Sequence, residues 1–332
     1  MNQRNNLGAI QRVGLSLMEL VVVLAILAAM ATAATVATDK FLAQRRFEKT
    51  QTGLDALRLA VLGRHETATE QAPSVTEGFV ADLGRLPMAI GDDPALQGAE
   101  LWLNPNNLQA YGLKQSTLDS EVWLACGWRG PYLRQPTGAV RYNDGWGRPF
   151  RMLSLDSGGA VVPAAAGQPI TGVASFGADG TLGAAPTNTA AWNQDMSVLF
   201  HDPMTPAAQH SSVSIQVTVW QRDGYGELQV PVDPTNATAA TSVEVRLFGP
   251  DGLGGLGVMQ QVRTGPFTTE PPRVAFTNVP IGPKVLRAYW TETAGLRKTV
   301  PMPIELTRTG KTEWSLILPA TISVPATPPS TP

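Results

Sequence analysis

One acidic residue lies inside the most apolar stretch of the chain. Glu19 occurs near the start of residues 14–37, which carry no other charged side chain. An ionised carboxylate within hydrocarbon costs at least about 2 to 3 kcal/mol, so such a residue is normally matched by a partner. We therefore expect Glu19 to pair with a positive charge that is presented within a membrane.

The other reactive side chains do not form a familiar catalytic pattern. The sequence contains no phosphate-binding loop, no HExxH or CxxC motif and no nucleophile elbow. Its three histidines are scattered, and His201 with Asp202 is best interpreted as a solvated pair rather than a catalytic or metal-binding one. The sequence therefore predicts a protein that is not an enzyme, although an enzyme hidden in the C-terminal part is kept as an alternative.

The bulk composition limits the kinds of partner and the kinds of fold that can be expected. A net charge of -2, with only 16% charged residues, provides no basic surface for nucleic acid. Cys126 is the only cysteine, so no intrachain disulfide can form and the fold must be held by packing or a bound ion. The 332 residues suggest two soluble parts, and the 32 glycines and 27 prolines favour short strands joined by turns.

A long helix must position Glu19. About 20 apolar residues suffice to cross a bilayer, so residues 14–37 predict a membrane-spanning helix. Apolar residues then recur every three or four positions up to Leu62, which predicts one continuous helix over residues 15–62. A secretory signal peptide would place its cleavage site after the apolar core, and a plain signal anchor would leave Glu19 unexplained.

The N-terminus resembles the class-III signal of type IV pilins and pseudopilins. The resemblance rests on a short basic leader, Gly14, an apolar residue, Ser16, two further apolar residues, Glu19 and the long apolar run. It implies that a prepilin peptidase removes the leader, residues 1–14, by cutting between Gly14 and Leu15, and then methylates the Leu15 amine. Glu19 would pair with the free amine of a neighbouring subunit. The first mature residue of the family is usually Phe, and here it is Leu15.

Residues 63–197 resemble the globular domain of the major pseudopilin of the type II secretion system. The resemblance rests on GPYL at residues 130–133, DGWGRP at 144–149 and SFGADG at 175–180, in that order after the helix. It implies a long helix packed on a small antiparallel sheet. In that family the loop after the third motif binds calcium, and Asp179 matches the aspartate of the motif. The resemblance therefore implies a calcium site at Asp179, but calcium prefers six or more oxygen ligands and Asp179 is the one clear acidic ligand, so whether calcium is bound is left open.

The remaining sequence predicts a second domain. Residues 198–211 are expected to form a linker, residues 212–320 a β-sandwich of about seven strands, and residues 321–332 a proline-rich tail. The glycine-rich residues 249–257 are expected to be a mobile loop. The sandwich loosely resembles the carboxypeptidase-regulatory or prealbumin-like class. The expected strands are residues 212–220, 226–232, 242–248, 272–279, 284–290, 298–306 and 312–319.

Taken together, the sequence predicts an α+β fold followed by a separate all-β sandwich. The expected function is that of a structural subunit of a type II secretion pseudopilus or a type IV pilus-like fibre, assembled with other pilin-like subunits. The resemblance places the protein in the bacterial inner membrane as a single-pass protein, with its globular part in the periplasm or outside the cell. In the alternative, the helix is only an anchor and the sandwich binds cargo, carbohydrate or an envelope protein. The identity of the machine, and a major or minor role within it, are left open.

Overall fold

The computed structural model describes most of the chain beyond its N-terminus. Gly14, Leu15, Asp179, the leader, the three histidines and the tail of residues 321–332 lie outside the described residues. The described residues are 17–63, 77–93, 96–135, 141–178, 180, 195–200, 212–222, 225–231, 242–265, 267, 270–292, 295–307 and 311–319.

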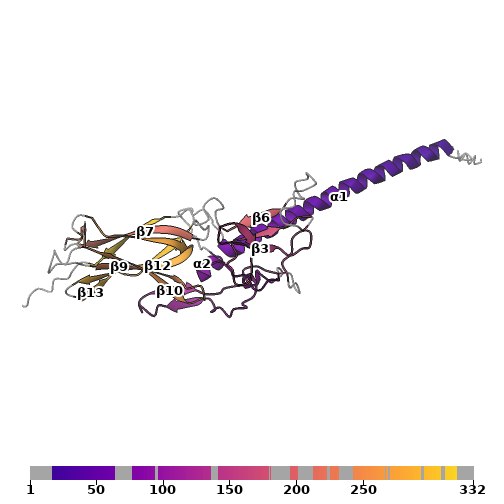
Figure 1. Cartoon of the computed structure of the whole chain (residues 1–332). Coiled ribbons are helices and arrows are strands. Elements are labelled where there is room, and N and C mark those ends of the chain that lie inside the picture. Colours follow the sequence, from indigo (N-terminus) through magenta and orange to yellow (C-terminus); the bar gives the residue numbers. More distant parts are fainter. Residues whose placement is uncertain are drawn as a thin grey trace, which may run out of the picture.

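Helix α1, Leu17–Leu62, is a single helix of 46 residues that extends from one end of the molecule. Figure 1 shows its first half standing clear of the rest of the chain, while its second half lies against the first domain. The helix ends at Gly63, which has a φ of 79° and whose N–H donates to the carbonyl of Leu59 at 2.8 Å. The continuous helix predicted over residues 15–62 is confirmed from Leu17 onward.

The first domain combines short helices, a hairpin and a small sheet. The hairpin pairs β1 with β2, and an antiparallel sheet has the order β4-β3-β5-β6, with β5 and β6 packed against α1. The elements are α2 Phe79–Leu83, the 3₁₀ helix η1 Ala99–Leu101, β1 Gly112–Gln115, β2 Trp123–Cys126, β3 Arg151–Leu155, β4 Val161–Pro163, β5 Gly172–Ser175 and β6 Met196–Leu199. A helix packed on a small antiparallel sheet is thus confirmed.

Helix α1 is seated on this domain by close backbone contact. The turn that carries the DGWGRP motif lies so near α1 that a Cβ on Gly145 would be 1.9 Å from the carbonyl oxygen of Arg46. The N–H of Gly145 donates to Thr50 Oγ1 at 2.9 Å. Gly53 likewise leaves room for Phe150, whose ring would be 2.8 Å from an added Cβ. These glycines therefore allow an approach that side chains would prevent.

The second domain is a β-sandwich with its own core. One sheet has five strands, with the order β10-β9-β12-β13 and β14 also paired with β12, and the other has four, with the order β11-β7-β15 and β8 paired with β7. The strands are β7 Ser212–Arg222, β8 Leu228–Gln229, β9 Ser242–Pro250, β10 Leu256–Thr264, β11 Arg273–Pro280, β12 Gly282–Glu292, β13 Gly295–Lys298, β14 Met302–Leu306 and β15 Glu313–Leu318. The predicted class, α+β with a β-rich C-terminal domain, is confirmed.

The two domains are in direct contact. Strand β2 packs on the outer face of the five-stranded sheet, where Val122 and Leu124 form a buried cluster with Phe248 and Val285. At the end of the sandwich, the start of β12 reaches α2, and a Cβ on Gly282 would lie 2.6 Å from the Cα of Ala81. The sandwich therefore rests on the hairpin and on α2 at the same time.

Three local expectations differ from the structure. The linker does not begin at residue 198, because Val198 and Leu199 belong to β6 and Phe200 is fully buried in the first domain. Residues 249–257 form no open loop: they include a hairpin turn in which Asp251 Oδ1 accepts from the N–H of Gly255 at 2.8 Å, and β10 begins at Leu256. The strand expected over residues 298–306 is interrupted before Met302 near Pro301, which lacks a backbone N–H.

Candidate functional site

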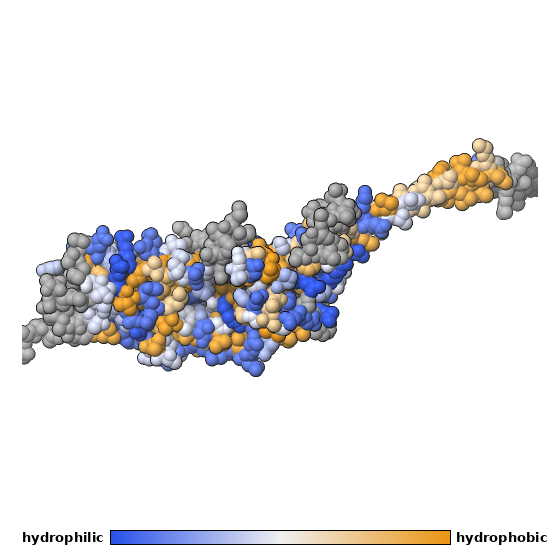
Figure 2. Space-filling model, viewed as in Figure 1, coloured by the Kyte–Doolittle hydropathy of each residue, from blue (hydrophilic) through white to orange (hydrophobic). Residues whose placement is uncertain are grey.

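The outstanding surface feature is the first half of α1. Among the described residues, α1 is the one helix long and apolar enough to cross a membrane, and none of its most apolar window is buried inside the protein. Figure 2 shows this apolar surface along the free end of the helix. Leu17 is 82% exposed and Met30 is 65% exposed. An apolar surface of this extent marks a site that lipid or another protein covers.

The threonine side chains in the first half of α1 form hydrogen bonds that do not require water. Thr32, Thr35 and Thr38 each donate their hydroxyl hydrogen to a carbonyl of the same helix, at 2.7, 2.8 and 2.8 Å. Hydroxyl groups that are satisfied within their own helix can enter hydrocarbon without losing a hydrogen bond. The threonines therefore do not oppose insertion into a membrane.

Glu19 lies in the first turn of α1 as the structure describes it, between the exposed side chains of Met18 and Leu20. The positive end of the helix dipole stabilises a negative charge at this position. Gly14 and Leu15 lie outside the described residues, so their predicted processing and pairing stay predictions. The structure does place Glu19 on the exposed apolar segment of α1.

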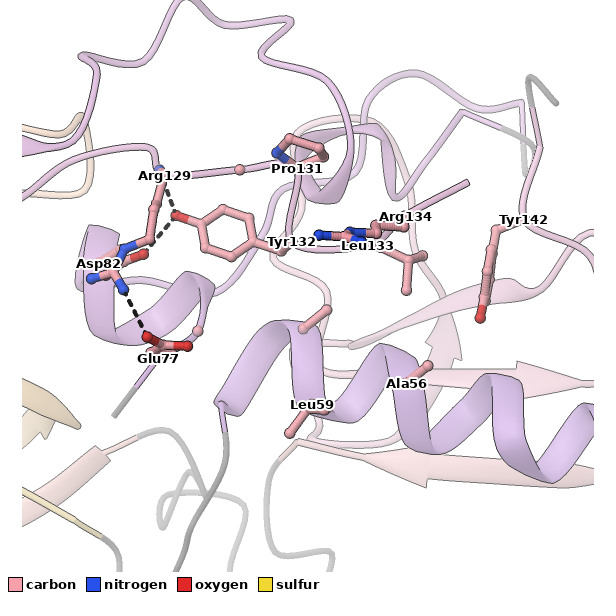
Figure 3. Close-up of a pocket in the computed structure, with 13 residues that line it drawn as sticks. Ala56, Leu59, Glu77, Asp82, Arg129, Pro131, Tyr132, Leu133, Arg134 and Tyr142 are labelled. Carbon is pink, nitrogen blue, oxygen red and sulfur yellow. Dashed lines mark hydrogen bonds and ion pairs between the residues drawn. The ribbon is translucent and has the colours of Figure 1, made fainter. Parts of the chain in front are cut away.

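A cleft of about 660 Å³ lies beside the other half of α1, where Ala56 and Leu59 form part of its wall. Figure 3 shows Asp82 between Arg129 and Tyr132 at one end of this cleft. Arg129 Nη2 is 3.0 Å from Asp82 Oδ1, and the Tyr132 hydroxyl donates to Asp82 Oδ2 at 3.1 Å.

Burial governs the ionisation of Asp82. The Asp82 side chain is 2% exposed, and burial raises its pKa from 3.8 to about 6, although the charge of Arg129 partly opposes the shift. Burial also raises the pKa of the Tyr132 hydroxyl well above its usual range, so Tyr132 stays a donor to Asp82. Because both carboxylate oxygens of Asp82 are engaged, this group ties the GPYL segment to α2.

The described residues near Asp179 do not fit a calcium ion. The Arg148 guanidinium donates to the carbonyl oxygens of Gly177 and Ala178 at 2.9 and 3.0 Å, and a Cβ on Gly180 would lie 2.4 Å from Nη1. Two oxygens that could have served as metal ligands are thus bound to a cation of the chain itself. Within the described residues, no group of three or more His, Cys, Asp or Glu side chains could hold a metal ion. Asp179 itself lies outside the described residues.

Asp144 links the turn of the DGWGRP motif, residues 144–149, to strand β5. Its Oδ1 accepts from the N–H groups of Trp146 and Arg148, both at 2.9 Å, and its Oδ2 accepts from the Ser175 hydroxyl at 2.7 Å. The second and third sequence motifs are therefore joined through one buried carboxylate. Sequence reasoning found these motifs but not the role of Arg148, whose proximity to Gly177 and Ala178 depends on the pairing of β3 with β5.

Comparisons with known proteins yielded no relative. No family model matches the chain, and neither a curated protein nor a solved structure shows significant similarity to it. One long apolar N-terminal helix followed by separate β-sheets is compatible with a pilin-like fold.

Proposed function

We propose that this protein is a non-enzymatic structural subunit that polymerises through its first helix. The fibre is a type II secretion pseudopilus or a related type IV pilus-like assembly, built from copies of this chain and other pilin-like subunits. A prepilin peptidase removes residues 1–14 and methylates Leu15. The subunit resides in the bacterial inner membrane before assembly, with its globular part in the periplasm or outside the cell.

The division of α1 into two halves is the observation that carries this proposal. The second half buries one face against the first domain, with Leu57 and Val61 inaccessible to solvent, whereas side chains from Leu17 to Phe41 contribute a long apolar surface. A helix with these two halves can reside in the lipid bilayer first and later pack against neighbouring helices in a fibre. Once the helix has left the membrane, burying this apolar surface against neighbours would stabilise the fibre in proportion to the area removed from water.

Glu19→Ala tests the assembly role directly. The variant should enter the membrane as the wild type does, since removing a charge cannot hinder insertion, but it should form few or no fibres. The matched control is Asp39→Ala, which removes an exposed carboxylate from the same helix beyond the apolar run. Fibres are counted by electron microscopy of sheared material, and membrane content by immunoblotting. Normal fibres from Glu19→Ala would contradict the proposal.

Processing is tested separately by N-terminal sequencing and intact mass. The mature protein should begin at Leu15, with or without a methyl group on its amine. A Gly14→Leu variant should keep residues 1–14, because the peptidase would lack the small residue before the cleavage site. A wild-type protein that retains its leader would contradict the assignment to the pilin class, but it would still be compatible with α1 acting as a membrane anchor.

A second candidate function is that of a membrane-anchored binding module. It is favoured by a second cleft, of about 420 Å³, at the junction of the sandwich and the first domain, which a purely structural domain would not require. The two functions differ in their assembly state. Site-specific cross-linking between cysteines introduced at exposed α1 positions should give ladders of multimers for a fibre subunit and none for a monomeric anchor.

A further inference from the structure

Lys284 is the most unusual titratable residue outside the site described above. It lies near the start of β12, only 3% of its surface is exposed, and its stem lies over Gly249, where an added Cβ would be 2.6 Å from Lys284 Cδ. The absence of a side chain at Gly249 makes the room that this stem fills. Lys284 also lines the 420 Å³ cleft at the domain junction.

The amine of Lys284 has only weak hydrogen-bond acceptors around it and no carboxylate partner among the described ion pairs. Its contacts are the backbone carbonyl of Pro283 at 3.3 Å and that of Ile281 at 3.5 Å, which are long for hydrogen bonds from an ammonium group. Lys284 takes part in none of the ion pairs between described residues. A buried ammonium without a carboxylate is costly, so this position either gives up its proton or acquires an anion.

The titratable groups around Lys284 also indicate that its amine must either lose its proton or acquire an anion. Burial lowers the pKa of Lys284 to about 7, and the nearby groups that favour its charge, the Cys126 thiol and the Glu305 carboxylate, do not restore the usual value. Burial also raises the pKa of Cys126 to about 11, which keeps this thiol neutral near pH 7. Among the described residues, the Glu305 carboxylate therefore offsets the effect of burial on the amine only in part.

The other charged residues in the cleft limit what could bind. Arg85 is already engaged, because its guanidinium holds the buried carboxylate of Glu100 at 2.8 and 2.9 Å and donates to the Gly252 carbonyl at 2.7 Å. Asp251 lines the cleft too, and its negative charge disfavours a doubly charged anion such as phosphate. A single negative charge matches the Lys284 amine, which forms no ion pair with the described residues and contacts only two backbone carbonyls at 3.3 and 3.5 Å.

We infer that the cleft between α2 and the β9–β10 turn is a binding site for a monocarboxylate, which pairs with the Lys284 amine. The carboxylate comes from a small organic acid or from the C-terminus of a polypeptide, since both present the same group. This inference does not rest on the fibre-forming function, because the cleft is lined mainly by residues that follow α2 or belong to β9 and β10. Figure 1 shows α2 and β10 away from the free half of α1.

The first experiment measures ligand-dependent melting of the full chain in detergent at pH 6. Acetate should raise the Tm in a saturable way for the wild type, and chloride at equal ionic strength should not. Lys284→Met should show no acetate response, while Lys311→Met, which removes an exposed lysine of the same domain, should respond as the wild type does. Equal responses in the Lys284→Met and wild-type proteins, or none in either, would overturn the inference.

Two further arms identify the source of the carboxylate and its protonation requirement. A blocked dipeptide with a free C-terminal carboxylate should bind more tightly than acetate if a polypeptide terminus is the ligand, and its amide should not bind. The affinity should fall about tenfold for each pH unit above the pKa of the amine, because only the ammonium form attracts the ligand. An affinity that is constant between pH 6 and pH 9 would contradict the pairing.

Chemical labelling gives a test that does not depend on the folding of any variant. Formaldehyde with borohydride converts accessible neutral amines to dimethylamines, and peptide mass spectrometry reports each lysine separately. Acetate should slow the dimethylation of Lys284 several-fold and leave that of Lys311 unchanged. Equal rates with and without acetate at Lys284 would overturn the inference even if Lys284→Met failed to fold.

Discussion

Arg287 of β12 forms an ion pair with Asp119, which precedes β2, and the distance between Nη1 and Oδ2 is 2.7 Å. Both side chains are buried, at 2% and 4% exposure, and the Tyr289 hydroxyl also donates to Asp119 Oδ2. Burial alone would raise the pKa of Asp119. The pKa is nevertheless lowered, because the carboxylate accepts hydrogen bonds from the Tyr289 hydroxyl and the Glu121 N–H and lies beside the positive charge of Arg287. One carboxylate thus joins the two domains.

Arg287→Met should destabilise the contact between the domains. The substitution leaves the buried carboxylate of Asp119 without its main counter-charge, and breaking such a pair typically costs about 3–5 kcal/mol. Urea unfolding of the full chain in detergent, followed by tryptophan fluorescence, should show an earlier transition. Lys298→Met is the control, because Lys298 pairs mainly with the half-exposed Glu121, and it should cost no more than about 1 kcal/mol. Equal effects of the two substitutions would contradict this assignment.

Gly145→Ala should loosen the attachment of α1 to the first domain. A methyl group at this position would collide with the backbone of α1 at Arg46, which cannot move aside as a flexible side chain could. We expect a loss of about 1–3 kcal/mol or more. Gly112→Ala is a matched control, since nothing lies within 4 Å of a Cβ there. Limited proteolysis of the folded chain, compared between the two variants, would show whether α1 is released.

The pH dependence of stability should contain a contribution from Asp82. Its pKa is raised to about 6 in the folded state, so the folded state binds the proton more tightly than the unfolded state does. The stabilisation is therefore fully present below pH 3.8 and is lost as the pH rises to about 6. Its size is roughly 2 to 3 kcal/mol. Asp82→Asn should flatten this part of the profile, and Asp55→Asn, at an exposed position on α1, should not. A profile that Asp82→Asn leaves unchanged would show that Asp82 is ionised more easily than its burial implies.

Calcium should have little effect on the turn that carries the SFGADG motif. Arg148 already binds two carbonyl oxygens there, so Arg148→Gln should lower the Tm whereas adding calcium to the wild-type protein should not raise it. Melting curves with calcium and with a chelator provide the measurement. A calcium-dependent rise in Tm that Asp179→Asn abolished would instead establish the metal site that the sequence resemblance implies.

The sequence predicted the elements that depend on local patterns. The length of α1 follows from an apolar run up to residue 37 and from apolar residues that then recur every three or four positions up to Leu62. Most sandwich strands were recognised by their alternation, because one face of each is buried. Strand β10 was missed, since its residues are mostly exposed and follow a glycine-rich segment.

The contacts that organise the molecule could not be read from sequence. Asp119 and Arg287 are 168 positions apart, and no periodicity connects them. Nothing in the local sequence distinguishes Lys284 from other strand residues, yet the register of β12 with β9 places it beside Gly249 in the interior. Pairings of this kind arise from tertiary packing, which local propensity does not encode.

The double support of the sandwich, by the hairpin and by Gly282 against α2, has a mechanical consequence. Because a backbone meets a backbone at Gly282, that contact resists compression more than a cushion of flexible side chains would. The buried ion pair at Arg287 opposes sliding of one domain past the other. We therefore expect the two domains to move together as one rigid body.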